Sequence, residues 1–158
     1  MMIICIYKYI LYLCFQMKTS QSKYCDCIYF SANALARKTE KLALESWKPV
    51  DLSPSLGYLL MLVIEEPGVQ PGTLSHHLQL TPSTITRLIE RLEEKKLVVR
   101  TYEGKLTNVY PSPKGKTMLP ELKACQDNFH QRYTKALGAD ESCRLVRSMN
   151  KLADKLEG

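Results

Sequence analysis

The sequence lacks an uncharged run long enough to cross a membrane, and it contains little glycine or proline. Its most apolar stretch, Met1–Gln16, is interrupted by Lys8, whereas a membrane-spanning helix needs about 20 apolar residues. With 7 glycines and 8 prolines among 158 residues, the chain is neither collagen-like nor of low complexity. These absences predict one globular domain, or one domain with an extension, and no membrane partner.

The sequence also lacks the residue patterns of an enzyme or a metal site. It has no glycine-rich phosphate loop, no paired acidic motif and no Ser/His/Asp arrangement. His76 and His77 are adjacent, so on a helix they point about 100° apart and do not easily ligate one metal. His130 is isolated in the sequence, and the cysteines are scattered. We therefore expect no catalytic activity, no bound metal and no other cofactor.

The N-terminus lacks the features of an export signal. Met1–Gln16 is apolar at 14 of its 16 positions, but it has no basic region before it and no small-residue cleavage site after it. The 6 cysteines are therefore expected to be reduced and the protein cytoplasmic. Residues 1–23 are predicted to be an extension. Met17 is an alternative start, so residues 1–16 are interpreted as untranslated or as a loosely docked helix, in preference to a membrane anchor.

The rest of the sequence contains a series of apolar patterns separated by proline. Apolar residues recur at helical spacing over Tyr24–Trp47, and Lys48-Pro49 ends that predicted helix. Ser53-Pro54 supplies an N-cap and a first-turn proline for the next helix. That helix is apolar nearly all round over Leu56–Ile64, which indicates a central buried position.

A helix-turn-helix is predicted next. A short helix over Pro71–Leu78 and a second helix starting at Thr81-Pro82 are separated only by Gln79-Leu80. The second helix carries a narrow apolar stripe at helical spacing, which leaves its other faces free to meet solvent or a partner. The stripe consists of Ile85, Leu88, Ile89 and Leu92.

A β-hairpin and further helices are predicted to follow. Leu97–Tyr102 and Leu106–Tyr110 indicate two strands around Glu103-Gly104-Lys105. A helix is predicted from about Lys114 and a last helix over Asp140–Glu157. Because a helix-turn-helix followed by a hairpin is a winged helix, the predicted fold class is mainly α (α+β).

The exposed face of the second helix indicates a DNA partner. Hydroxyl side chains at a helix N-terminus suit phosphate oxygens, and arginine reads guanine in the major groove. Residues 70–116 carry 8 Lys/Arg and 4 Asp/Glu, within a chain of net charge +6. An ordinary solvated helix face is the alternative, because Glu90, Glu93 and Glu94 lie on the same helix. The predicted DNA-binding residues are Thr81, Pro82, Ser83, Thr84, Thr86, Arg87, Arg91 and, at the tip of the wing, Lys105.

The segment Leu74–Arg100 strongly resembles the DNA-binding core of the MarR family of bacterial transcription regulators. The likeness covers about Tyr24 to Gly158, and Ser112-Pro113-Lys114-Gly115 resembles the Leu-Thr-x-x-Gly ending of the family's wing. The resemblance implies a homodimer that places two winged helices on a pseudo-palindromic operator in double-stranded DNA. Residues 24–158 would form the MarR-type domain, with a DNA-binding core at 53–116 and dimerisation helices at 24–50 and 114–158.

The resemblance also implies a mode of regulation. Many relatives are repressors that a small phenolic ligand, an oxidant or a metal releases from DNA. We therefore expect a sequence-specific transcriptional regulator, a repressor released by a small-molecule effector.

The sequence departs from the family pattern at three places. Gln79 stands where the family usually has glycine in the turn, and Lys96 stands where glycine usually follows the recognition helix. Both positions are expected to have positive φ. Glu103-Gly104-Lys105 replaces the Asp-Arg-Arg signature of the wing. Lys105 would therefore contact a phosphate without the two parallel hydrogen bonds that an arginine guanidinium can donate.

Two alternative functions stay open. Some peroxide sensors of the family carry a reactive cysteine near Cys25 and Cys27, of which Cys27 is the closer match, and a helix N-terminus stabilises a thiolate. The other interpretation of Cys27 is a small buried apolar residue at the dimer interface. A winged-helix interaction module that does not bind DNA is the second alternative. Loss of Arg87 and Arg91 would favour that module, and both are present.

Overall fold

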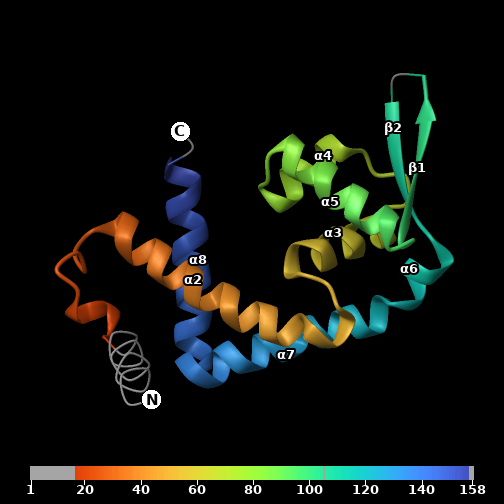
Figure 1. Cartoon of the computed structure of the whole chain (residues 1–158). Coiled ribbons are helices and arrows are strands. Elements are labelled where there is room, and N and C mark those ends of the chain that lie inside the picture. The colour runs from red at the N-terminus through yellow and green to blue at the C-terminus, as the bar shows by residue number, and fades with distance from the viewer. Residues whose placement is uncertain (1–16, 105, 157–158) are drawn as a thin grey trace, which may run out of the picture. The chain divides into compact units, whose positions relative to one another are not determined.

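The computed structural model describes residues 17–104 and 106–156, and these belong to two compact units, residues 1–41 and 42–158 (Figure 1). The described part of the first unit contains a short 3-10 helix, η1 (Thr19–Gln21), followed by turns. Helix α2 (Ile28–Trp47) begins in the first unit, and its last turns belong to the second. Of the extension predicted over residues 1–23, residues 1–16 lie outside the described residues.

The start of α2 corrects the predicted start at Tyr24. Residues 24–27 form turns instead, because local hydrogen bonds to side chains compete with the helix. The hydroxyl of Ser22 accepts from the backbone N–H of Tyr24 at 3.2 Å. The hydroxyl of Ser31 donates to the carbonyl oxygen of Cys25 at 3.0 Å. The end of the helix agrees with the sequence, since Lys48–Val50 form the 3-10 helix η2.

The second unit is built around α3 (Pro54–Glu65). Ser53 caps this helix through its hydroxyl, which accepts from the backbone N–H of Leu56 at 3.4 Å. Leu59, Leu60 and Val63 are completely buried, which confirms the central position predicted from the apolar run. Trp47 is also completely buried and stacks edge-on against Tyr58, with ring centroids 5.2 Å apart.

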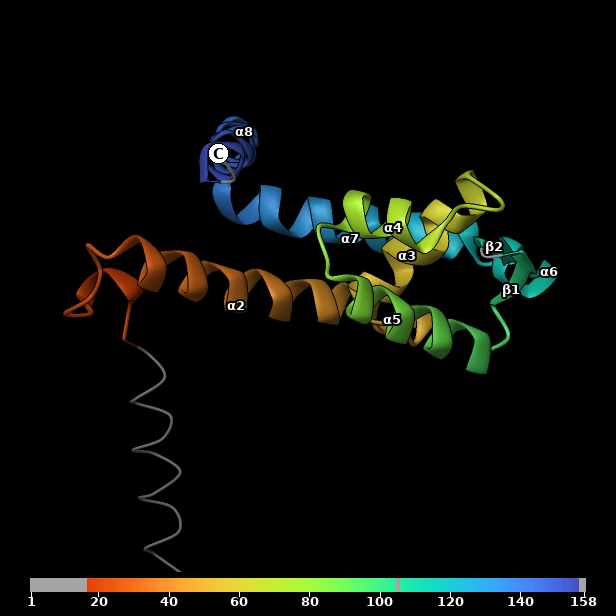
Figure 2. The same ribbon diagram turned by 90° about the horizontal axis from the view of Figure 1, so that it is seen from above.

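Several elements pack around α3. They are α4 (Pro71–Leu78), α5 (Pro82–Glu94), α6 (Pro113–Thr117), α7 (Leu119–Leu137) and the second strand of the hairpin. Helices α3, α4 and α5 form the winged helix together with the hairpin. Figures 1 and 2 show α3 between α5 and α7 in both views. Strands β1 (Val98–Glu103) and β2 (Leu106–Pro111) pair in an antiparallel register that runs from Val98 opposite Pro111 to Glu103 opposite Leu106. Strand β1 begins and ends one residue later than the predicted Leu97–Tyr102, and β2 ends one residue later than the predicted Leu106–Tyr110.

The C-terminal helices differ from the predicted pair by one break. The helix predicted from Lys114 consists of α6 (Pro113–Thr117) and α7, which are separated at Met118. Pro120 lies in the first turn of α7, and a proline inside a continuous helix lacks the N–H donor and clashes with the preceding turn. Helix α8 (Ala139–Leu156) follows Gly138 and contacts α7.

The mainly α fold with a winged helix-turn-helix is therefore confirmed. Among the helices within residues 17–104 and 106–156, none is long and apolar enough to cross a membrane.

Candidate nucleic-acid interface

The turn between α4 and α5 is closed by the side chains around it. Gln79 has a φ of 51°, the left-handed conformation predicted for this position. Its side-chain amide donates to the carbonyl oxygen of His76 at 2.9 Å and so satisfies a carbonyl at the end of α4. The hydroxyl of Ser75 donates to the carbonyl oxygen of Leu80 at 2.5 Å. These contacts fix the direction in which α5 leaves the turn.

The N-terminus of α5 presents a cluster of hydroxyl groups. Thr81 is the N-cap, and its Oγ1 accepts from the backbone N–H of Thr84 at 3.3 Å. The same oxygen lies 3.1 Å from Ser83 Oγ and 2.9 Å from Thr84 Oγ1. Pro82 occupies the first turn, where it removes one of the backbone N–H groups that a helix N-terminus leaves unpaired. Hydroxyls and the remaining N–H groups at the positive end of a helix dipole suit an anion such as a phosphate.

The two arginines lie further along the outer face of α5. Arg87 and Arg91 are both exposed, and within residues 17–104 and 106–156 neither has an ion-pair partner. A surface depression of about 410 Å³ runs beside them, with Glu90 and Glu94 also in its lining. Arg87 is the arginine closer to the hydroxyl cluster. Thr86 is exposed, although its hydroxyl already donates to the carbonyl oxygen of Pro82 at 3.0 Å.

The opposite face of α5 holds the helix on the core. Its four stripe residues, Ile85, Leu88, Ile89 and Leu92, are all buried, as predicted.

Two ion pairs lie at the C-terminal end of α5. Lys95 Nζ lies 2.8 Å from Asp51 Oδ2 just beyond the end of α5, and Glu93 binds Arg100 on β1. The hydrogen bond from Lys95 lowers the pKa of the Asp51 carboxyl, and the hydrogen bond to Glu93 raises the pKa of Arg100.

The structure brings seven of the eight residues predicted to bind DNA together on one helix and its cap. The eighth, Lys105, lies outside the described residues, so its role stays a prediction from the sequence. Whether the seven bind DNA also stays a prediction. The sequence analysis did not identify the contact between Glu93 and Arg100. Glu93 lies near the end of a helix and Arg100 lies in the following strand. The periodicity of a single helix or strand therefore does not predict that these two side chains meet.

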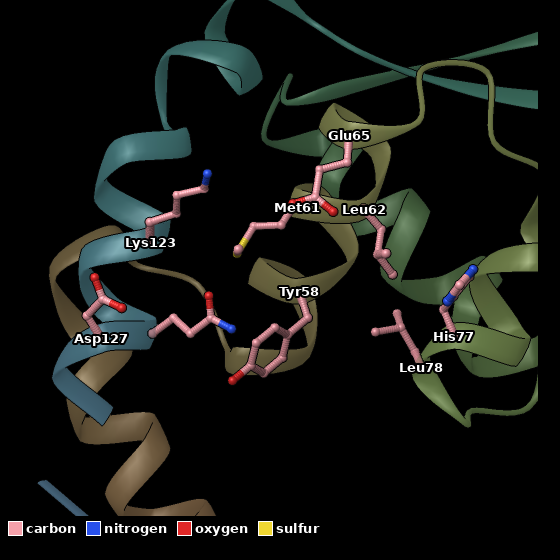
Figure 3. Close-up of a pocket in the computed structure, with 9 residues that line it drawn as sticks. Tyr58, Met61, Leu62, Glu65, His77, Leu78, Lys123 and Asp127 are labelled. Atoms are coloured by element: carbon pink, nitrogen blue, oxygen red, sulfur yellow. The ribbon is translucent and has the colours of Figure 1, made fainter. Parts of the chain in front are cut away.

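A cavity of about 590 Å³ lies where α3, α4 and α7 meet (Figure 3). Figure 3 shows Lys123 and Asp127 on α7 at one side, Tyr58, Met61, Leu62 and Glu65 on α3, and His77 and Leu78 on α4 at the other. Gln126 completes the lining. Burial raises the pKa of the Tyr58 hydroxyl, so this group is a neutral hydrogen-bonding partner at the wall. The cavity therefore offers an apolar floor with charged and polar groups at its rim.

The described cysteines differ in accessibility. Cys27 is exposed directly before α2, and Cys25 is half-buried. Cys125 is buried in α7, and burial raises the pKa of its thiol, which disfavours a reactive thiolate. Cys27 is thus exposed in the single chain, and its burial at a dimer interface stays a prediction. Among the described residues, no three His, Cys, Asp or Glu side chains are grouped to hold a metal ion.

Comparisons with known proteins agree with this arrangement. The sequence model of the MarR family matches residues 50–104. The HTH-type transcriptional repressor MdtR of Bacillus subtilis (strain 168) is 25% identical over 144 residues, which cover 89% of this chain and 92% of MdtR. The structure of CouR from Rhodococcus jostii RHA1 bound to p-coumaroyl-CoA is similar with a TM-score of 0.67 and 25% identity, covering 80% of this chain and 90% of CouR. A structure of the transcriptional repressor CouR bound to a 23-mer DNA duplex gives a TM-score of 0.75 at 20% identity, covering 87% and 99%.

Proposed function

We propose that the chain is a transcriptional regulator of the MarR family, whose sequence model matches residues 50–104, and that it binds a pseudo-palindromic DNA operator as a homodimer and represses transcription until a small-molecule effector releases it. The two alternative functions are a peroxide sensor that uses Cys27 and an interaction module that does not bind DNA.

The observation that carries the DNA-binding proposal is the outer face of α5. The exposed arginines Arg87 and Arg91 follow a hydroxyl-rich helix N-terminus. The apolar side chains on the inner face of the helix are all buried in the core. A recognition helix enters the major groove with its N-terminal residues toward the base edges. In that position Arg87 reads a base, and Thr81, Ser83 and Thr84 meet phosphates. CouR, which has this fold, is described in complex with a 23-mer DNA duplex, and this supports DNA binding as the proposed role.

The cavity between α3, α4 and α7 is the site we propose for the effector. It joins α4, the first helix of the helix-turn-helix, to α7, which leads away from the winged helix toward α8. A molecule bound there would fix α4 relative to α7 and would favour one spacing of the two DNA-binding units over another. A ligand shifts such an equilibrium only by its differential affinity for the two arrangements. A repressor of this kind acts on the chromosome without catalysis, so we propose a cytoplasmic protein that is not an enzyme.

The DNA-binding proposal is tested by selecting bound duplexes from a randomised library with the purified protein. We expect the selected sequences to share a pseudo-palindrome, because a dimer binds two half-sites related by its two-fold axis. The double variant Arg87→Ala/Arg91→Ala should enrich no sequence. If the wild-type protein enriches none either, the chain is an interaction module and the DNA-binding proposal fails.

The effector proposal has its own optical readout. Trp47 is the single tryptophan in the sequence, and its ring contacts Tyr58, which lines the cavity. Titration with a panel of aromatic carboxylates and aromatic amines should therefore change the fluorescence of Trp47 for a ligand that binds, and the same ligand should release the selected duplex. The variant Leu78→Arg, which fills the cavity wall with a long cation, should abolish both responses and keep DNA binding. A ligand that releases DNA from this variant with unchanged potency would contradict the assignment of the cavity.

A further inference from the structure

The carboxylate of Glu93 makes two contacts with one residue of the wing. Its Oε2 lies 2.5 Å from Arg100 Nη2, and its Oε1 accepts from the backbone N–H of Arg100 at 3.1 Å. Glu93 is on the last turn of α5, and Arg100 is in β1. One side chain thus binds both the guanidinium and the main chain of the same residue. Both side chains are about a quarter exposed, at 27% for Glu93 and 24% for Arg100.

The backbone contact closes the outer edge of the hairpin. Arg100 lies opposite Val109 in the register of the two strands. The backbone N–H of Val109 donates to the carbonyl oxygen of Val69 at 3.1 Å, outside the hairpin. The backbone N–H of Arg100 likewise donates outside the hairpin, to Glu93. The hairpin is therefore held at both edges at the residue pair Arg100–Val109. Val69 binds the β2 edge, and Glu93 of the recognition helix binds the β1 edge.

The tip of the described hairpin lacks such support. Asn108, one residue beyond this pair on β2, is still buried, but Tyr102 and Leu106 nearer the tip are 70% and 52% exposed, so the end of the wing does not pack on the core. An unsupported two-stranded hairpin is only marginally stable in water. Its direction therefore depends on the two contacts that hold the strands, Val69 with Val109 on β2 and Glu93 with Arg100 on β1, and the second of these joins the wing to α5.

We propose that Glu93 and Arg100 are positioning residues for DNA binding, which set the direction of the wing relative to the recognition helix so that both reach the same duplex together. The inference rests on the proposed function. Glu93 itself would not touch DNA. Its carboxylate is an anion close to a polyanionic ligand, so electrostatics alone would make its neutralisation tighten DNA binding. The positioning role gives the opposite sign.

The test compares Glu93→Gln with Glu94→Gln. Both variants remove one negative charge from the last turn of α5, but Glu94 is exposed and has no ion-pair partner among the described residues. The probe is a duplex that wild-type protein selects from a randomised library. We expect Glu94→Gln to bind it slightly more tightly. Glu93→Gln should bind about 3- to 10-fold more weakly, a range typical of coupled neighbouring residues.

Three further measurements separate positioning from a general loss of stability. Lost wing contacts should lower the slope of log affinity against log salt by about 0.9 for each phosphate released, whereas a less stable but correctly shaped protein keeps its slope. Amide hydrogen exchange in residues 98–104 and 106–111 should accelerate in Glu93→Gln without DNA, while the buried amides of α3 keep their protection. A double-mutant cycle with Arg100→Gln should be non-additive, because both changes release the same contact.

The outcomes separate this inference from the proposed function. Tighter binding by Glu93→Gln, an unchanged salt slope or additive effects in the cycle would overturn the positioning role while leaving DNA binding intact. If wild-type protein selects no duplex, the proposed DNA-binding function is wrong, and Glu93 then has no positioning role in DNA binding. The exchange measurement on the free protein then decides whether Glu93 holds the hairpin at all.

Discussion

Two arginines on the outer face of α5 have different surroundings. Arg87 follows the hydroxyl cluster of Thr81, Ser83 and Thr84, whereas Arg91 lies one turn further, with Glu90 and Glu94 on either side of it in the sequence. Because the N-terminal part of a recognition helix penetrates most deeply into the major groove, Arg87 is the better candidate for a base contact. Arg91 is then expected to contact the backbone.

The first prediction separates these two roles. Arg87→Ala should cost about 1–3 kcal/mol on the selected duplex and relax the base preference at one position of each half-site. Arg91→Ala should weaken binding to selected and scrambled duplexes by similar factors. Binding isotherms on both duplexes measure this, and Arg144→Ala serves as the control because it removes an arginine of α8 that pairs with Glu141. If Arg87→Ala weakens both duplexes equally, Arg87 is a phosphate contact.

The second prediction concerns the two residues with positive φ that replace glycine around α5. Lys96 has a φ of 60°, its side chain is exposed, and no hydrogen bond of that side chain offsets the strain within the described residues. Gln79 has a φ of 51°, but its amide donates to His76. Relief of left-handed strain is worth about 1–2 kcal/mol per residue, less the entropy that a new glycine gives the unfolded chain.

Lys96→Gly should therefore raise the free energy of unfolding by about 0.5–1 kcal/mol. Gln79→Gly should leave it nearly unchanged, because the variant also loses a hydrogen bond worth about 1 kcal/mol. Urea unfolding at one fixed protein concentration measures both. A larger gain for Gln79→Gly than for Lys96→Gly would show that the side-chain amide does not compensate the strain.

At the scale of the elements, local signals in the sequence predicted most of the winged helix. The bounds of α4 follow from Pro71 and the two-residue turn, and the buried face of α5 follows from the spacing of its stripe. The start of α2 was missed because hydrogen bonds of Ser22 and Ser31 compete with a pattern that is still helical in spacing. The break before α7 has a visible cause in Pro120. The contact between Glu93 and Arg100 joins two different elements, so only the folded chain reveals it.

The third prediction tests the junction between the wing and α6. Gly115 is buried, and a Cβ atom at this position would lie 2.1 Å from the carbonyl oxygen of Leu97, which is backbone and cannot move aside easily. Gly115→Ala should therefore lower the free energy of unfolding by about 2–3 kcal/mol through overpacking. Gly72→Ala in α4 is the matched control, since a Cβ atom there meets nothing within 4 Å. That control should stabilise the protein by about 0.4–1 kcal/mol. Equal effects in urea unfolding would contradict the close approach.

At the scale of the whole molecule, regulation by a thiol gives the fourth prediction. Cys27 is exposed and directly precedes α2, whereas Cys125 is buried with a raised pKa. If the effector is a small molecule that binds the cavity, mild peroxide treatment should leave the affinity for the selected duplex unchanged, with Cys27→Ser as the comparison. A peroxide-induced loss of binding that Cys27→Ser abolishes would instead favour the redox sensor. The same loss in both proteins would assign the oxidation to another residue.

The last prediction concerns dimerisation through α8. Helix α8 carries an apolar stripe whose members Met149, Leu152 and Leu156 are 48%, 51% and 82% exposed. Exposed apolar residues that line up on one helix face are typical of a surface that a partner covers. Leu152→Glu places a charge in this stripe, and burying an unpaired charge is unfavourable.

We therefore expect Leu152→Glu to sediment as a monomer at micromolar concentration. Its operator affinity should fall by about 100-fold or more, because binding at one half-site no longer raises the effective concentration of a winged helix at the other. Asn150→Glu adds the same charge outside the stripe and should remain a dimer with unchanged affinity. Circular dichroism should show equal helix content in both variants, so that the difference reports association and not folding. A dimeric Leu152→Glu would exclude this face of α8 from the interface. A monomer that still binds the full operator as tightly as the wild type would contradict the need for two linked winged helices.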